Sequence, residues 1–405
     1  MKHKSTPAQV PSTSSPSPKS PLRVAIVHDW LTNMGGAEPL VLELHKLYPD
    51  APIYTSVYDK QKMTAFADCD VRTTYLQKVL PGFLRYKHVL WPVLRAHAFR
   101  KLDMSEYDLI ISSSTAESKS VKKKPGATHI CYCNTPTRYY WSHYDEFKNS
   151  FHFGPLNILI KPFIPFFVWW MRKLDLKAAA GVDHFIANSN EVKRRIKKYY
   201  GRDSTVIFPG VDTGRFAQIP SSKAQNPSTQ YPSPNPQPRS GYITWGRHVP
   251  YKKIDLAIEA CNLLEEQLTV IGSGPETERL KQIAGPTITF PGRVSDDELV
   301  KLAHKSKAFI FPGDEDFGIS PVEAIASGLP VIAYKSGGAL DYVIEGKTGT
   351  FFTSQTVPAL AKAIKNFEYK DYEHSELQNF AESFSNSRFR QEIREFVDHK
   401  LRSRD

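Results

Sequence analysis

Hydrophobic and polar positions along this chain follow two alternating patterns. Short runs rich in Val, Ile and Phe, each closed by a turn, predict buried parallel strands. The longer segments between them carry apolar residues at helical spacing and predict helices. In the first half, strands are expected in LRVAIVHDW, YDLIISSST, ATHICYCNTP, DHFIANS and TVIFPGVD. Strands that alternate with helices predict a parallel sheet covered on both faces.

The same alternation starts again in the second half. Strands are expected there in GYITWGR, QLTVIGSG, TITFPGRV, AFIFPG, PVIAY and GTFF. Between the halves, Ile219–Gly241 is rich in Pro, Ser, Asn and Gln and has no apolar periodicity, which is typical of a linker or surface excursion. Two doubly wound domains in series would hold a ligand between the carboxyl ends of their strands. The predicted fold class is therefore α/β, with two Rossmann-like domains facing an interdomain cleft.

The predicted organisation of the chain has five parts. It consists of a disordered tail (1–21), an N-terminal Rossmann-like domain (22–216), a Pro/Ser-rich linker or insert (217–240), a C-terminal Rossmann-like domain (241–380) and a C-terminal helix (381–405). The last of these is amphipathic and charged, and we expect it to cross back to the N-terminal domain.

Two segments raise the question of a membrane. Phe153–Lys173 is very apolar, but Lys161 and three prolines interrupt it. A buried core helix, or a stretch lying on a membrane surface, therefore fits better than a span. Phe83–Leu102 alternates basic and large apolar residues. It is predicted either to rest on an anionic leaflet or to be an ordinary amphipathic helix of the N-terminal domain.

Charge and cysteine content narrow the class of partner. The net charge is +11, and 28 Lys and Arg stand against 18 Asp and Glu in residues 22–216, compared with 14 against 19 in 241–380. A basic half favours a polyanionic or membrane-surface partner. No nucleic-acid motif accompanies the charge, so nucleic acid is not expected. Four scattered cysteines and an N-terminus without an apolar signal run predict a cytoplasmic protein, peripheral on the inner membrane face if it binds lipid.

The stretch GDEDFGISPVEAIASG carries the first candidate site residues. Ser320 is expected to cap a helix that begins at Pro321, with Glu323 in its first turn and Glu315 in the loop ahead. The free N–H groups of a helix N-terminus attract anions, and Gly318 lets backbone approach a ligand closely. Acidic residues also favour helix starts in general. That simpler reading explains Glu323 alone, but not Glu315 on a glycine loop.

Cations and glycine turns surround these carboxylates in the sequence. Arg247, Lys252 and Lys253 follow the first strand of the second half, where a strand-to-helix loop faces the cleft. Arg binds a diphosphate bidentately, and Lys adds a point charge. Gly272 and Gly274 form another such turn, for which a tight turn without any ligand is the alternative. Together these features predict a nucleotide-diphosphate pocket in which the carboxylates bind hydroxyls.

In these blocks the chain resembles a known family. GDEDFGISPVEAIASGLPVIAY is similar to the E-x7-E segment of retaining glycosyltransferases of family 4, which adopt the two-domain GT-B fold. WGRHVPYKKIDLAIEA, VIGSGPE and GGALDYVIEGKTG resemble the same family's donor-domain blocks in the same order. HDWLTNMGGAE and CYCNTPTRYYW are similar to mannosyltransferases of surface-polysaccharide assembly. The resemblance covers roughly residues 22–400 except the insert at 219–240.

The resemblance implies roles for individual residues. Glu323 would bind the ribose hydroxyls, and Glu315 would lie against the donor sugar. Arg247 and Lys252 would hold the diphosphate and stabilise charge on the leaving group. The other residues implied on the donor side are Asp316, Phe317, Gly318, Ile319, Lys253, Gly272, Gly274, Gly35 and Gly36, and those on the acceptor side are Asn134, Arg138 and Tyr139.

One residue departs from the family pattern. Asn134 stands where the block CYCNTPTRYYW commonly carries His. An amide takes no proton at neutral pH, so base function from this position is in doubt. The resemblance also implies that no divalent metal is needed, so Asp68/Asp70 and Asp314/Asp316 are not expected to be metal ligands, and no cofactor is expected.

The predicted function is therefore metal-independent, retaining hexosyl transfer from a nucleotide sugar to a glycan or lipid-linked acceptor. GDP-mannose is the first candidate donor, and an anionic membrane surface is a further candidate partner. A nucleotide-sugar isomerase (an epimerase) on the same fold, and a catalytically inactive nucleotide-sugar-binding protein, remain as alternatives. Analysis of the products separates transfer from isomerisation, because transfer yields a nucleoside diphosphate and a glycosylated acceptor. Donor hydrolysis or transfer that is abolished by Glu315→Ala would exclude the inactive binding protein.

Overall fold

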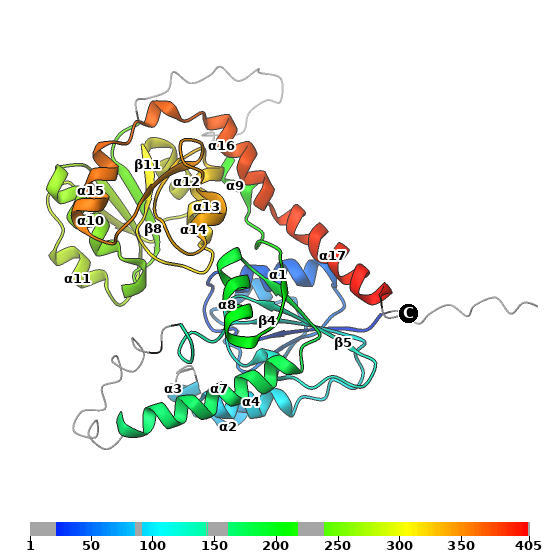
Figure 1. The fold of residues 1–405 in the computed structure, drawn as a ribbon. Coiled ribbons are helices and arrows are strands. Elements are labelled where there is room, and N and C mark those ends of the chain that lie inside the picture. The colour runs from blue at the N-terminus through cyan, green and yellow to red at the C-terminus, as the bar shows by residue number, and fades with distance from the viewer. Residues whose placement is uncertain (1–21, 86–90, 143, 145–160, 218–238, 404–405) are drawn as a thin grey trace, which may run out of the picture.

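The computed structural model describes residues 22–85, 91–142, 144, 161–217 and 239–403. The predicted tail, most of the predicted linker and the first part of Phe153–Lys173 lie outside these described residues. Figure 1 shows two α/β domains, each built on its own sheet with helices on both faces. The predicted pair of Rossmann-like domains is therefore confirmed.

The N-terminal domain is built on a seven-stranded sheet in the order β3-β2-β1-β4-β5-β6-β7. Every strand pair in it is parallel. The central strands are entirely buried, because helices cover both faces of the sheet. The strands are β1 (Val24–His28), β2 (Ile53–Thr55), β3 (Val71–Thr73), β4 (Leu109–Ser114), β5 (Thr128–Cys133), β6 (His184–Ala187) and β7 (Ser204–Val206).

Helices connect these strands. They are α1 (Glu38–Leu47), α2 (Leu76–Val79), α3 (Gly82–Arg85), α4 (Pro92–Arg100), α7 (Ile164–Ala180), α8 (Asn190–Tyr200) and α9 (Thr213–Ala217), with short 3-10 turns η1 (Thr64–Phe66), η3 (Ser118–Ser120) and η5 (Lys161–Phe163). Capping residues set both ends of α8. Ser189 accepts a hydrogen bond from the Val192 amide at 3.1 Å, and Gly201 ends the helix in the left-handed region at φ 65°.

The C-terminal domain is built on a six-stranded parallel sheet in the order β10-β9-β8-β11-β12-β13. Its strands are β8 (Tyr242–Arg247), β9 (Leu268–Ser273), β10 (Ile288–Gly292), β11 (Ala308–Phe311), β12 (Val331–Tyr334) and β13 (Gly349–Phe352). Its helices are α10 (Ile254–Leu264), α11 (Thr277–Gln282), α12 (Asp296–Lys305), α13 (Ile319–Ala326), α14 (Ala339–Tyr342), α15 (Val357–Lys365), α16 (His374–Ala381) and α17 (Asn386–Arg402), with 3-10 turns η6 (Pro250–Lys252), η7 (Tyr369–Asp371) and η8 (Glu382–Phe384).

Two helices link the domains. Each follows the strands of one domain in the sequence but packs on the other domain. α9 falls within the predicted N-terminal range, yet Val211 and Phe216 are buried in the core of the C-terminal domain. α17 follows the C-terminal sheet, but Phe389, Ile393 and Val397 are buried in the core of the N-terminal domain. Figure 1 shows α17 running from one domain to the other.

The predicted amphipathic helix over Phe83–Leu102 is not one continuous helix. α3 is described over Gly82–Arg85 and residues 86–90 lie outside the described part, but Trp91 has a non-helical backbone, at φ −125° and ψ 35°, and α4 begins after it at Pro92. Arg95 of α4 is buried and donates to Glu117 at 2.8 Å. α4 is therefore anchored in the domain through Arg95, while Leu94 of the same helix is exposed. In the segments that the structure describes, no helix combines the length and the apolar composition needed to cross a bilayer.

A buried ion pair ties α7 to the turn after β4. Lys119 Nζ lies 2.7 Å from Asp175 Oδ1, and both side chains are almost inaccessible. Burial alone lowers the pKa of Lys119, but the Asp175 carboxylate raises it above its ordinary value. Asp175 also accepts hydrogen bonds from Trp141 at 2.8 Å and Tyr200 at 2.8 Å. The pair therefore fixes α7 against the segment that carries the predicted acceptor-side residues.

Lys119→Met should lower the free energy of unfolding by about 3–5 kcal/mol, because it leaves the Asp175 charge buried without its partner. Chemical denaturation of the parent and the variant measures this loss. Lys124→Met is the matched control, since its pair with Asp108 at 2.9 Å is partly exposed. The control should cost less than about 1 kcal/mol. Equal losses in the two variants would contradict the role assigned to the buried pair.

Candidate active site

Two of the predicted catalytic residues meet at the carboxyl ends of the C-terminal strands. Lys252 ends η6 in the loop after β8, and Glu315 lies in the loop after β11. The Lys252 Nζ donates to Glu315 Oε1 at 2.5 Å, and the two side chains are 15% and 14% exposed. Burial alone lowers the pKa of Lys252, but the Glu315 carboxylate raises it, so the lysine is a cation at neutral pH. A cation and a carboxylate are thus held together at the edge where such sheets bind ligands.

The helix that carries Glu323 starts earlier than predicted. α13 begins at Ile319, and its N-cap is Gly318, at φ 87°, with no side-chain hydrogen bond at the cap. Ser320 is therefore inside the helix and is not the cap, and Glu323 is the fifth helical residue, beyond the first turn. The interpretation of Ser320 was wrong because the loop turns into the helix one residue earlier than expected, at Gly318, whose backbone at φ 87° and ψ 97° strongly favours glycine.

Glu323 points back toward β8. Its Oε2 accepts a hydrogen bond from the indole N–H of Trp245 at 2.9 Å, and its Oε1 lies 3.6 Å from Arg215. Burial raises the pKa of the Glu323 carboxyl, while the Trp245 donor and the Arg215 charge oppose that rise. The Glu323 carboxylate already accepts one hydrogen bond from Trp245 and lies near the Arg215 charge. Its remaining acceptor capacity suits hydrogen bonds from neutral hydroxyl groups.

The other two predicted cations are not part of this cluster. Arg247 is exposed at the end of β8, and its side chain forms no hydrogen bond or ion pair with a described residue. Lys253 is also exposed and adopts a left-handed backbone, at φ 52°, where η6 turns into α10. The structure therefore brings Lys252 to Glu315 and leaves Arg247 and Lys253 facing solvent at the same strand end.

Gly272 and Gly274, which were predicted on the donor side, pack closely against protein backbone. A Cβ on Gly272 would lie 1.9 Å from the carbonyl oxygen of Gly246, and one on Gly274 would lie 2.3 Å from that of His248. These glycines are therefore required for the close approach of β8 and β9. This packing is what the alternative for the G-x-G sequence, a tight turn without any ligand, requires.

The loop after Glu315 is fixed by aromatic packing. Phe317 is buried, and its carbonyl accepts a hydrogen bond from Tyr342 at 2.8 Å. A Cβ on Gly318 would lie 2.7 Å from the same Tyr342 hydroxyl. Phe317 also stacks on Phe208 of the N-terminal half, with ring centroids 5.8 Å apart. This loop is thus held rigidly where the domains meet.

The glycine pair of the first N-terminal loop faces this part of the C-terminal domain. A Cβ on Gly36 would lie 3.4 Å from Ile319 Cδ1, the first residue of α13. The Gly35 amide donates to Glu38 Oε2 at 2.8 Å, and His28 Nε2 lies 3.6 Å from the other oxygen of Glu38. Burial alone lowers the pKa of His28, but Glu38 raises it. Glu38, held by His28, therefore fixes the backbone of the loop that contains Gly35 and Gly36.

Asp316 joins the two domains through its side chain. Its Oδ2 accepts from Arg138 Nε at 2.9 Å, and its Oδ1 accepts from Arg195 and, at 3.3 Å, from Thr135. All three donors belong to the N-terminal domain. Glu191 holds Arg195 from its other side at 2.7 Å. The predicted acceptor-side residue Arg138 and the predicted donor-side residue Asp316 are thus direct partners.

The remaining acceptor-side residues lie beside Arg138. Asn134 donates to Ser113 Oγ at 3.0 Å, and its carbonyl accepts from Asn188 at 2.9 Å. Tyr139 packs edge-on against Tyr140, with ring centroids 5.9 Å apart, and burial raises its pKa to about 12. Both residues are therefore part of the wall of the N-terminal domain near the interface.

Several residues of the interface were not found by sequence reasoning. They are Trp245, Arg195, Thr135 and Tyr251. The ring centroid of Tyr251 lies 5.4 Å from the guanidinium carbon of Arg138. Glu191 and Arg195 stand one helical turn apart, which is the only signal the sequence offers for this group. Nothing in the run EVKRRIKK shows which of its cations faces the other domain.

No metal-binding cluster of three or more His, Cys, Asp or Glu is found among the described residues. Two cavities of about 460 and 320 Å³ occur elsewhere on the molecule, one beside Arg202 and Lys400 and the other beside Thr269 and Phe290. Neither is lined by a predicted site residue. The candidate site is therefore defined by the loops that meet between the domains.

On the ribose-binding role that the family resemblance implies for Glu323, Trp245→Phe should weaken nucleotide binding more at acidic than at neutral pH. Phenylalanine retains the aromatic packing on Phe309 but removes the N–H that stabilises ionised Glu323. Loss of this donor raises the pKa of Glu323 further, so the carboxylate protonates at higher pH as the solution is acidified. Calorimetry with GDP at several pH values measures the ratio of the variant's dissociation constant to the parent's. Protonation of GDP itself affects both constants equally and therefore cancels in this ratio. A ratio independent of pH would contradict this role for Trp245.

Two family models together match most of the chain. The model described as Glycosyltransferase Family 4 matches residues 34–215, and that described as Glycosyl transferases group 1 matches residues 232–384. These two regions correspond to the two sheets described above.

Similar curated proteins include a GDP-mannose-dependent alpha-(1-6)-phosphatidylinositol monomannoside mannosyltransferase of Mycobacterium tuberculosis. It is 30% identical over 215 residues, which cover 48% of this chain and 54% of that protein. The chain thus spans about half the length of the first curated relatives that it matches. Alpha-1,3/1,6-mannosyltransferase ALG2 of Dictyostelium discoideum is 22% identical over 390 residues, covering 85% of this chain and 89% of that protein.

Similar solved structures extend over nearly the whole chain. HepE of Anabaena in complex with UDP gives a TM-score of 0.64 at 18% identity, covering 93% of this chain and 100% of that one. Sucrose-phosphate synthase of Thermosynechococcus elongatus gives a TM-score of 0.70 at 16% identity, covering 95% of this chain and 100% of that one. At these identities the likeness shows the fold alone, and that fold is GT-B.

Proposed function

The chain belongs to glycosyltransferase family 4, and we propose that it transfers a hexose from a nucleotide sugar to a glycan or lipid-linked acceptor. Mannose from GDP-mannose is the proposed donor, because the M. tuberculosis relative is by name a GDP-mannose-dependent mannosyltransferase. The single observation that carries the proposal is the Lys252–Glu315 pair at the strand ends of one domain, opposite Gly36 and Arg138 of the other.

The proposed donor site uses residues of both domains. Glu323 binds the ribose hydroxyls, and Glu315 lies against the sugar. Lys252 receives the diphosphate, joined by Arg247, which is free of other described partners at the end of β8. Family resemblance supports these roles, and the ion pair supports the presence of a cation where the diphosphate would lie.

In the proposed reaction the acceptor hydroxyl oxygen bonds to the anomeric carbon while the bond from that carbon to the diphosphate oxygen breaks, and the hydroxyl proton passes to the departing diphosphate oxygen on the same face of the sugar. The bonding pair departs with the diphosphate, whose new charge is stabilised by Lys252 and Arg247. Retention of configuration and independence of a divalent metal are proposed from the family resemblance. The Asn134 amide takes no proton, so Asn134 has no role as a base in the proposed reaction.

A melting-temperature screen against GDP-, UDP- and ADP-sugars tests the donor proposal, because a ligand that binds the native state stabilises it. We expect GDP-mannose to raise the melting temperature most. Incubation with that donor and a glycan or lipid-linked acceptor should then release GDP and yield a glycosylated product. Release of a free, altered sugar nucleotide with no glycosylated product would contradict transfer. A larger rise in melting temperature with a UDP- or ADP-sugar would contradict GDP-mannose as the donor.

A further inference from the structure

α7 differs from an ordinary surface helix on its outward side. Its inward residues are buried against the domain, as expected: Ile164, Val168, Met171, Asp175 and Ala179. The outward side of a surface helix is normally polar. Here it carries large aromatic side chains that are 37–70% exposed: Phe163, which precedes the helix, and Phe166, Phe167, Trp169 and Trp170. We call these five residues the aromatic ridge.

The ridge is flanked by positive charge. Lys173 and Lys177 are exposed on the same helix, and Lys173 Nζ lies 3.8 Å from the ring centroid of Trp169. The single acidic residue of α7, Asp175, is buried in its pair with Lys119. The outward face of α7 is thus aromatic and cationic, with no exposed acidic residue in the helix.

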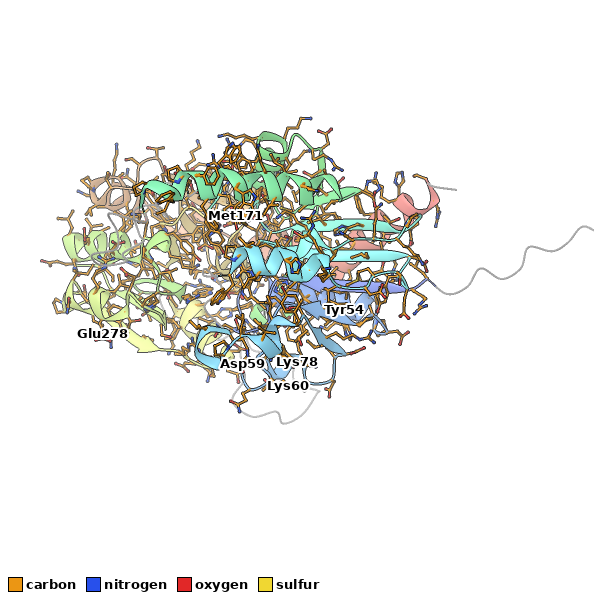
Figure 2. All side chains as sticks on the ribbon, turned by 90° about the horizontal axis from the view of Figure 1, so that it is seen from below. Tyr54, Asp59, Lys60, Lys78, Met171 and Glu278 are labelled. Carbon is orange, nitrogen blue, oxygen red and sulfur yellow. The ribbon has the colours of Figure 1, made fainter. Side chains whose placement is uncertain are left out.

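The neighbouring helices extend this face. Seen from below in Figure 2, α7 and α4 run side by side across the N-terminal domain, with Met171 labelled on α7. Figure 1 shows the same two helices together along the lower edge of that domain, and Val93 of α4 packs against the buried cluster to which Met171 belongs. Leu94 of α4 and Val79 of α2 are exposed, as is Lys78 of α2, and neither helix contains Asp or Glu.

We propose that the aromatic ridge docks on the surface of an anionic lipid bilayer. Trp and Phe rings insert at the level of the lipid headgroups, where an amphipathic helix lies in the plane of the membrane. Lys173, Lys177 and Lys78 attract the negative charge of the leaflet. An exposed apolar patch of this size marks an interaction surface, and its charge selects the partner.

Charge also argues against a second copy of the chain as the occupant. A two-fold contact places the same patch of both copies face to face. Lys173 and Lys177 of one copy would then lie close to the same cations of the other, with no exposed carboxylate of α7 to offset them. An anionic bilayer supplies the opposite charge and a layer for the aromatic rings.

The ridge is mechanically joined to the acceptor side of the candidate site. Arg172 Nε donates to the carbonyl of Tyr140 at 2.5 Å, and Trp141 Nε1 donates to Asp175 at 2.8 Å. Arg138 lies two residues before Tyr140. A bilayer seated on the ridge would therefore lie beside the segment that meets a lipid-linked acceptor; this consequence rests on the proposed function, whereas the docking itself does not.

Flotation of the full chain with vesicles tests the docking without any substrate. We expect the parent to float with phosphatidylcholine vesicles that contain about 30% phosphatidylglycerol, to float less with pure phosphatidylcholine, and to show a blue shift of tryptophan emission on binding. Trp169→Gln combined with Trp170→Gln should reduce vesicle binding roughly tenfold and remove most of the blue shift. Lys173→Glu combined with Lys177→Glu should reduce binding to the anionic vesicles by at least roughly tenfold.

Matched controls lie on the C-terminal domain. Leu263→Gln removes an exposed apolar side chain of α10, and Lys362→Glu with Lys365→Glu makes the same charge change on α15. These controls should float like the parent. A parent that stays in solution with anionic vesicles, or ridge variants that float as well as the parent, would overturn the proposal. Melting shifts with the donor, measured on every variant, report the proposed function separately.

Discussion

Glu315→Gln should lower turnover at least a hundredfold, yet leave binding of GDP as tight as in the parent or tighter. In the parent, the incoming diphosphate must share Lys252 with the Glu315 carboxylate, which lies 2.5 Å from it. Glutamine keeps the size of the side chain but removes its charge, so Lys252 is freed for the diphosphate. The same change removes the carboxylate proposed to position the donor sugar, and removal of such a group costs roughly 10² or more in rate.

Steady-state kinetics with the donor found by the melting screen, and calorimetry with GDP, measure these two effects. Glu278→Gln is the matched control, because Glu278 forms an exposed pair with Lys281 at 3.1 Å on α11, and it should behave as the parent does. A Glu315→Gln protein with the parent's turnover would remove Glu315 from the catalytic residues. A large loss of GDP affinity would show that its charge does not compete for Lys252.

Asp316→Asn should separate the two domains and reduce turnover by roughly one to two orders of magnitude. The Asp316 carboxylate is the shared partner of Arg138 and Arg195, and its side chain is 7% exposed. Its neutral replacement removes the charge that Arg138 and Arg195 share, and leaves Arg195 paired with Glu191 and Arg138 with only the more distant charge of Glu315 among the described carboxylates that act on it. Breaking a buried ion pair from one side costs about 3 kcal/mol or more, which is enough to shift a balance between closed and open domains.

Small-angle X-ray scattering should show a larger radius of gyration for Asp316→Asn, and kinetics should show the lower turnover. Asp341→Asn is the matched control, since Asp341 also bridges the domains but accepts from a neutral partner, the Nδ2 of Asn190 at 2.7 Å. The control should have the smaller effect, because no charge is left unpaired on Asn190. An Asp316→Asn protein with the parent's radius of gyration and turnover would show that the ion pairs do not hold the domains together.

Much of the fold was predictable from the sequence because local patterns determine it. Buried β-branched runs such as LIISSS and THICYC became central parallel strands, and the caps at Ser189 and Gly201 set both ends of α8. These features depend on neighbours in the chain, which periodicity records directly. The helix at Ile319 shows the limit, since Ser320 is as good a cap as Gly318 until the backbone angle of the loop is known.

Contacts between distant residues were not predictable in the same way. Asp316 was placed on the donor side by the family resemblance, but its side chain meets Arg138 and Arg195, which lie 178 and 121 positions away. No periodicity records such a meeting, because it depends on how the two domains pack. The apolar composition of α7 likewise fits a core helix, and only the fold shows that Trp169 and Trp170 face outward.

The most direct measurement of the site is a crystal structure of the chain with GDP bound. We expect the β-phosphate to lie within hydrogen-bonding distance of Lys252 Nζ, about 3 Å, and a ribose hydroxyl to lie at the same distance from a Glu323 oxygen. GDP bound at another place on the molecule, with the Lys252–Glu315 pair undisturbed and Glu323 in contact only with Trp245 and Arg215, would contradict the proposed donor site.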